Sequence, residues 1–454
     1  MRVKFFYYIV TSVLYGILSF IDIKLAVFVF IILMCVALIF EKYKNYIVVF
    51  LFLSMFLIPL WVNSYGLFRV SFGIIKINYP LIGLMLVSIA VISKGALKKI
   101  AWTNVDKAVL LFFIYEFVSI LSKHTSETLG GSYDVIFPFL FYFLFAFLRD
   151  IYNTNDIFYL LNVLLIALVI EGLLFIIMYT VKLSPFAEPI EIYGKTTEYI
   201  SLQIFQPVGA SGPVEMGYFF VIGILISYML YKLTKRNLYL LGSYFFIVPL
   251  LASVSRLPLF IGVLLLIIVT LNSINKRKRG VIALTVILSA VALFSLTGLL
   301  DVFVRGIDER MMEISILQDV ENRWYFTVPN VIYYLSSNLE NLLFGAGYQL
   351  FRKMPFGSAP HNIFLAEAAD FGLIGLLLML NLFYSIINYV KRSKTLGVFE
   401  TLLGKVIIYC ILIWIVNGFV QYAAYSFSFY TFIFLLFNFF VSMADRRDSR
   451  MYNL

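Results

Sequence analysis

The residue type best suited to acid–base chemistry in this chain is His361, one of only two histidines in 454 residues. It follows Pro360, which can start a helix rigidly, and precedes a long apolar stretch. If the helix is continuous from His361, one stripe below it holds Leu365, Ala368, Gly372 and Gly375. The glycines would let another backbone approach closely. A neutral imidazole with a pKa near about 6.5 can take a proton from a hydroxyl, although a histidine that only caps the helix fits the same pattern.

Two arginines are candidate anion-binding groups. Arg256 lies in the Ser255–Pro258 turn between two apolar segments, and Arg323 opens an aromatic stretch, Trp324–Tyr334. A planar guanidinium at the membrane surface can hold a pyrophosphate through two parallel hydrogen bonds. Pairing with a lipid headgroup or a carboxylate explains either residue equally well.

Acidic residues give a second set of candidates. Glu116 and Glu171 lie inside apolar segments, where an ionised carboxylate is costly, so they are either functional or protonated groups that tie two helices together. Glu367 and Asp370 would face away from the His361 stripe on a continuous helix. Because the sequence has no paired metal-ligand spacing, phosphate loop or dinucleotide fingerprint, we expect neither a metal nor a cofactor.

The elements that position these residues are membrane helices. The chain is 62% hydrophobic and 13% charged, with a mean hydropathy of +0.96, which is too apolar for a soluble domain. We predict an all-α, polytopic integral membrane protein of about 14 transmembrane helices, with 12–14 as the range. The predicted spans are 4–21, 25–40, 46–62, 79–94, 106–122, 133–148, 156–180, 214–231, 237–254, 257–273, 280–297, 361–390, 403–420 and 424–443.

Basic clusters in alternate connections, Arg149 among them, predict that both termini are cytoplasmic. The net charge of +10 is therefore a topology signal, and no nucleic-acid partner is expected. We predict one transmembrane domain over residues 1–454. Its longest outer segment, 298–360, is a large extracytoplasmic loop, in which Pro329 divides the aromatic stretch into one or two short amphipathic helices at the interface.

The pattern His361-Asn362, Gly372 and Gly375 resembles the motif of the O-antigen ligase and Wzy-type polysaccharide polymerase superfamily. Ser255-Arg256 resembles that family's outer Ser-Arg turn, Arg323 the arginine that opens its loop helix, and Gly345-Ala346-Gly347 its Gly-x-Gly turn. One position departs from the family, because Gln206 stands where many members carry an arginine.

The resemblance implies a GT-C-like membrane glycosyltransferase on the outer face of the bacterial cytoplasmic (inner) membrane. Its partners would be a glycan donor on undecaprenyl pyrophosphate, a glycan acceptor and membrane lipid, with chain-length regulator and flippase proteins as further candidates. His361 would accept the acceptor's hydroxyl proton, while Arg256 and Arg323 neutralise the leaving pyrophosphate without a metal. The anomeric configuration would invert. Asn362, Gly345, Gly347, Gly372, Gly375 and Gln206 would support this site.

Three functions remain open. A polymerase that joins lipid-linked repeat units is favoured by the high span count and the divergent N-terminal third. An O-antigen ligase, which transfers the finished glycan to lipid A core, needs the same reaction centre. A non-enzymatic flippase or proton-coupled transporter would be favoured if Glu116 and Glu171 were essential and His361 were not.

Overall fold

The structure is a computed structural model that is helical apart from one hairpin. It describes residues 69–72, 75–78, 102–123, 133–149, 152–181, 213–252, 256–273, 328–348, 350–351, 362–393, 397–420 and 427–451, with scattered positions between 7 and 36. The hairpin pairs β1 (Arg69–Phe72) with β2 (Ile75–Asn78) in antiparallel register, in a segment for which no strand was predicted.

The chain divides into two compact units. In the unit formed by residues 1–67 and 158–313, the described helices are α8 (Thr154–Val181, from Phe158 on), α10 (Pro213–Thr234), α11 (Asn237–Phe245), α12 (Ile247–Ala252) and α13 (Arg256–Ser273). Where one span, 237–254, was predicted, two consecutive helices, α11 and α12, are separated by a turn at Phe246. Pro249 has no N–H to donate to Phe245, which accounts for the interruption.

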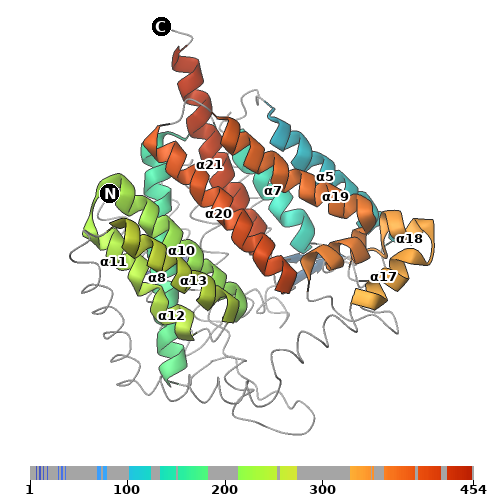
Figure 1. Cartoon of the computed structure of the whole chain (residues 1–454), viewed down its shortest axis with the longest axis horizontal. Helices are drawn as coiled ribbons and strands as arrows, with labels where there is room; N and C mark the ends of the chain where they lie inside the picture. The colour runs from blue at the N-terminus through green and yellow to red at the C-terminus, as the bar shows by residue number, and fades with distance from the viewer. Residues whose placement is uncertain are drawn as a thin grey trace. The chain divides into compact units, whose positions relative to one another are not determined.

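The other unit, residues 68–157 and 314–454, contains the helices that carry most of the predicted site. They are α5 (Asn104–Lys123), α7 (Tyr133–Phe147), α17 (Val328–Ser336), α18 (Leu339–Phe344), α19 (Ile363–Arg392), α20 (Val398–Val420) and α21 (Phe427–Met451). Contacts run from α5 to α7, α21, α20, α19 and back to α5, so these five helices close into a ring, with α17 and α18 at one end of α19 (Figure 1).

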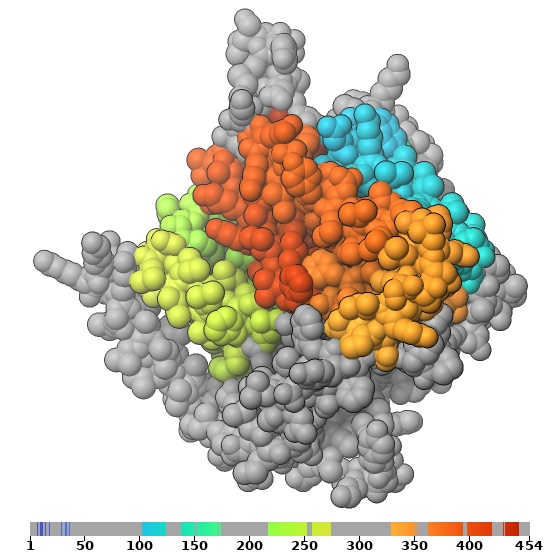
Figure 2. All heavy atoms as spheres, turned by 45° about the vertical axis from the view of Figure 1, so that its right-hand side comes forward, coloured from blue at the N-terminus to red at the C-terminus, as the bar shows by residue number. Residues whose placement is uncertain are grey.

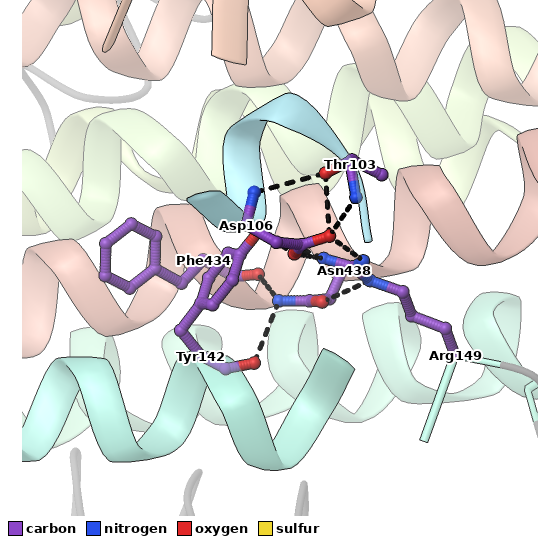
Figure 3. Close-up of polar contacts among 6 residues, drawn as sticks. All are labelled: Thr103, Asp106, Tyr142, Arg149, Phe434 and Asn438. Atoms are coloured by element: carbon purple, nitrogen blue, oxygen red, sulfur yellow. Dashed lines mark hydrogen bonds and ion pairs between the residues drawn. The ribbon is translucent and has the colours of Figure 1, made fainter. Parts of the chain in front are cut away.

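A buried ionic network holds α5 against α7 and α21 near the start of α5 (Figure 3). Arg149 donates to both Asp106 oxygens at 2.9 and 2.7 Å and to Asn438 Oδ1 at 2.7 Å, while the Tyr142 hydroxyl donates to Asp106 at 2.6 Å. Thr103 caps the helix through reciprocal bonds with Asp106. Arg149, which we counted among the basic residues of the cytoplasmic connections, is therefore a buried, neutralised partner of Asp106.

Three described helices are long and apolar enough to cross a membrane: Gly217–Thr234, Ile363–Arg392 and Val398–Phe419. The burial pattern agrees with this assignment. On α5 the acidic residues Asp106 and Glu116 are buried, whereas Leu111, Val118 and Leu121 are about half exposed. Continuous apolar surface around a polar interior is unusual in water and is compatible with a membrane protein.

Candidate functional site

The candidate site is built around a junction, here called the α18–α19 junction, where residues Gly345–Tyr348 run against α19. Helix α18 starts at the Asn338 cap and ends at Gly345. The backbone N–H groups of Ala346 and Gly347 then donate to the carbonyls of Ala369 and Asp370, both at 2.8 Å. These carbonyls are available because α19 is interrupted two residues later.

The interruption lies at Gly372, whose φ of 70° and ψ of −173° are not helical. Gly345 has nearly the same conformation, with φ 66° and ψ −167°, in a region that only glycine adopts readily. A Cβ on Gly345 would lie 2.5 Å from Gly372 N, and one on Gly372 would lie 2.2 Å from Leu343 O. The two backbones are therefore in direct contact, as the sequence predicted for a glycine at this position.

The same geometry corrects the predicted helix. A single stripe through Leu365, Ala368, Gly372 and Gly375 is wrong, because α19 consists of a first segment, 363–371, and a second segment, 373–392, on either side of Gly372. The helix also begins at Ile363, after the Asn362 cap, so His361 precedes the cap and is not the first helical residue.

Asn362 fixes the start of α19 with its whole side chain. Its Oδ1 accepts the backbone N–H groups of Phe364 at 2.9 Å and Leu365 at 3.1 Å, and its Nδ2 donates to the carbonyl of Phe419 in α20 at 3.5 Å. The first two bonds satisfy amides that the helix leaves free. The third connects the cap to a neighbouring helix, which an aspartate could not do because its carboxylate carries no donor.

Helix α5 holds the junction from the other side, through two residues that we did not single out from the sequence. The Tyr115 hydroxyl donates to Phe371 O at 2.6 Å, and Lys123 Nζ donates to Gly345 O at 2.5 Å. The two residues are eight positions apart, which places them on one face of α5. That spacing was the signal in the sequence, but nothing there indicated which helix the face would contact.

Helices α17 and α18 lie at the surface beside the ends of α5 and α19 (Figure 2). The 298–360 segment contains two described short helices, but Pro329 does not divide the aromatic stretch, because it lies inside α17, and α18 lies beyond Tyr334. The Tyr334 hydroxyl donates to Asn341 Oδ1 at 3.1 Å. Burial, together with the nearby carboxyls of Glu340 and Asp370, raises the pKa of Tyr334 to about 12, so this hydroxyl remains a donor at neutral pH.

The junction also gathers acidic side chains. Glu116 of α5 and Glu367 and Asp370 of α19 are all at most 3% exposed and interact electrostatically. Glu367 Oε1 and the Tyr115 ring both lie over Gly375, within 3.1 and 3.3 Å of where its Cβ would be. Among the described residues, no group of three His, Cys, Asp or Glu side chains could hold a metal ion.

The remaining predicted residues are placed only in part. His361, Arg323 and Gln206 lie outside the described residues. Arg256 is the first residue of α13, and Glu171 lies within α8, but their side chains also lie outside the described set. The structure therefore brings together Gly345, Gly347, Gly372 and Gly375, and it fixes Asn362 at the opposite end of the first segment of α19.

Comparisons with protein-family models and with curated proteins gave no match to this chain.

Proposed function

We propose that the protein is a membrane glycosyltransferase that polymerises undecaprenyl-pyrophosphate-linked oligosaccharide repeat units on the outer face of the cytoplasmic membrane. The observation that supports this most is the clamping of the first segment of α19, which follows His361 directly. Asn362 ties its start to α20, and near its end the carbonyls of Ala369 and Asp370 accept hydrogen bonds from Ala346 and Gly347. A general base is effective only when it is held in place against the substrate, and the residue after His361 is held from two directions.

In the proposed reaction, His361 takes the proton of the acceptor hydroxyl as that oxygen attacks the anomeric carbon of the donor. The bond from the anomeric carbon to the pyrophosphate breaks, and its electron pair leaves with undecaprenyl pyrophosphate. Attack from the opposite face inverts the anomeric configuration. Arg256 and Arg323 supply fixed positive charge for the leaving group.

The proposed architecture is a GT-C-like protein of about 14 spans, with both termini in the cytoplasm. In that topology the Lys123 end of α5, helices α17 and α18, and the start of α19 share the outer face. Their observed proximity in one unit is consistent with this arrangement. The proposed donor and acceptor would approach from this side.

Two alternatives remain. An O-antigen ligase would use the same base and the same cations but would transfer the glycan to lipid A core. A proton-coupled transporter or flippase for lipid-linked glycans is favoured by one observation, the burial of Glu116 beside two further carboxyls of α19.

The test uses purified protein, a synthetic undecaprenyl-pyrophosphate repeat unit and a gel that resolves glycan length, with chelator present. His361→Ala is compared with His124→Ala, which replaces the only other histidine. We expect a ladder of products from wild type and from His124→Ala, and none from His361→Ala. Transfer only when lipid A core is supplied would identify a ligase. An unchanged ladder from His361→Ala would reject the proposed mechanism.

A further inference from the structure

The buried carboxyl of Glu116 is a group that the proposed transfer reaction does not use. Glu116 lies in the middle of α5, 3% exposed, in the face that packs on α19. The described charged groups that act on it are the carboxyls of Glu367 and Asp370, which carry the same sign of charge. An ionised carboxylate in this position would lose its hydration and be repelled by its neighbours.

Asp106 on the same helix shows how this chain treats a buried carboxylate that is ionised. It is 1% exposed, yet Arg149 contacts both of its oxygens and Tyr142 donates a further hydrogen bond. Full pairing of this kind allows a charge to remain in an apolar interior. Within the described part of the chain, Glu116 forms no ion pair.

The described titratable groups that act on Glu116 come from α19 and α21. Helix α19 supplies Glu367 and Asp370, and Tyr430 of α21 interacts with the carboxyls of Glu116 and Glu367. Arg149, which follows the end of α7, is already bound to Asp106. On α5 itself, Lys123 lies seven positions away and donates to the carbonyl of Gly345.

A second, independent observation is Ser119. Its Oγ is buried and has no hydrogen-bond partner among the described residues, and the residue is 7% exposed. Ser119 stands one helical turn from Tyr115 and one from Lys123, both of which reach the α18–α19 junction, so its side chain faces the same interface. It also follows Glu116 by three positions, which puts the two side chains on adjacent positions of one face.

We propose that Glu116 and Ser119 form a proton-binding site at the α5–α19 interface, in which Glu116 carries a proton at neutral pH. The ligand we propose is a proton; among the described residues, no group of three His, Cys, Asp or Glu side chains is placed to hold a metal ion. The bound proton removes the charge of Glu116 and supplies a hydroxyl donor, which a buried Ser119 or a carboxylate of α19 can accept.

The test is chemical modification with dicyclohexylcarbodiimide, an apolar reagent that reacts with protonated carboxyls, followed by mass spectrometry of peptides. It requires no glycan substrate, so its outcome is independent of the proposed transferase activity. Glu116 should be modified at neutral pH, and the modification should decrease about tenfold per pH unit above its midpoint. Asp106, which is equally buried but paired with Arg149, should remain unmodified and is the internal control.

Substitution provides a measurement that does not depend on reagent access. Glu116→Gln mimics the protonated carboxyl and should leave the thermal melting midpoint unchanged, whereas Asp106→Asn should lower it. An equal loss of stability from both variants would overturn the proposal, because it would mean that Glu116 is ionised and paired. Modification of Asp106 to the same extent as Glu116 would also overturn it. If sodium but not choline protects Glu116 from modification by the carbodiimide, the ligand is a metal cation and the proposal of a proton is overturned.

Discussion

Replacing Gly372 with alanine tests the central contact of the site. The substitution adds one methyl group where α19 is interrupted and where α18 ends. The new Cβ would lie 2.2 Å from Leu343 O, 2.3 Å from Leu343 C and 2.5 Å from Phe344 N. All three are backbone atoms, so no side-chain rotation can relieve the clash, and α18 must move away from α19.

The expected loss of stability has two parts. Holding a residue other than glycine at φ 70° and ψ −173° costs about 1–3 kcal/mol. Forcing an additional methyl group into a filled space costs about 1–3 kcal/mol more. The total of about 2–6 kcal/mol is a large share of the roughly 5–15 kcal/mol that stabilises a typical protein.

The assay is thermal unfolding in detergent, followed by size-exclusion chromatography of the folded fraction. Gly172→Ala is the matched control, because Gly172 is helical and its nearest neighbours, Phe245 and Pro249, are side chains 3.0 and 3.2 Å from the new Cβ. Alanine gains about 1 kcal/mol of helix propensity there, which offsets the tight contact, so we expect a melting midpoint close to that of wild type.

A double substitution identifies the source of the loss. Gly345→Ala should destabilise the protein as Gly372→Ala does, because each separates the same two backbones. Together they should cost less than the sum of the single losses, since one contact cannot be broken twice. The proposed backbone contact is wrong if Gly372→Ala has the same melting midpoint as Gly172→Ala. It is also wrong if the losses of stability from Gly345→Ala and Gly372→Ala simply add in the double variant.

Three further predictions concern the groups that hold α5 and α19. Asp106→Asn should destabilise the protein by about 3–5 kcal/mol, because it leaves the charge of Arg149 buried and uncompensated. Adding Arg149→Met to this variant should recover much of the lost melting midpoint, and no recovery would argue against the ion pair. Asn362→Ala should cost about 1 kcal/mol of stability through loss of the cap and should reduce transfer activity. Asn362→Asp should retain the cap but lose the bond to Phe419. Equal melting midpoints for wild type and both variants would contradict this role. Lys123→Met should lower the melting midpoint by removing the donor to Gly345. Glu340→Gln should have almost no effect, because Glu340 is 74% exposed and 3.8 Å from Lys123. A larger loss from Glu340→Gln than from Lys123→Met would refute the role of the Lys123 hydrogen bond.

Within the described residues, the sequence by itself determined most of the helical segments. Predicted spans 106–122, 133–148 and 156–180 correspond to helices α5, α7 and α8, because long apolar runs bounded by polar residues have few other structures to form. It also indicated Gly372 and Gly375 through their spacing from His361, whereas Gly345 and Gly347 became candidates only through the family resemblance.

Only the tertiary structure decided which of these residues meet. The interruption of α19 at Gly372 accompanies its contact with α18, which lies almost thirty residues away in the chain, so a helical periodicity could not reveal it. Glu116 appeared in the sequence as a single acid in an apolar run, and the packing of α5 on α19 placed it with Glu367 and Asp370. Arg149 looked like a loop charge until the fold paired it with Asp106. Local patterns fix which residues are helical, whereas the contacts between helices depend on pairs of positions that are distant in the sequence.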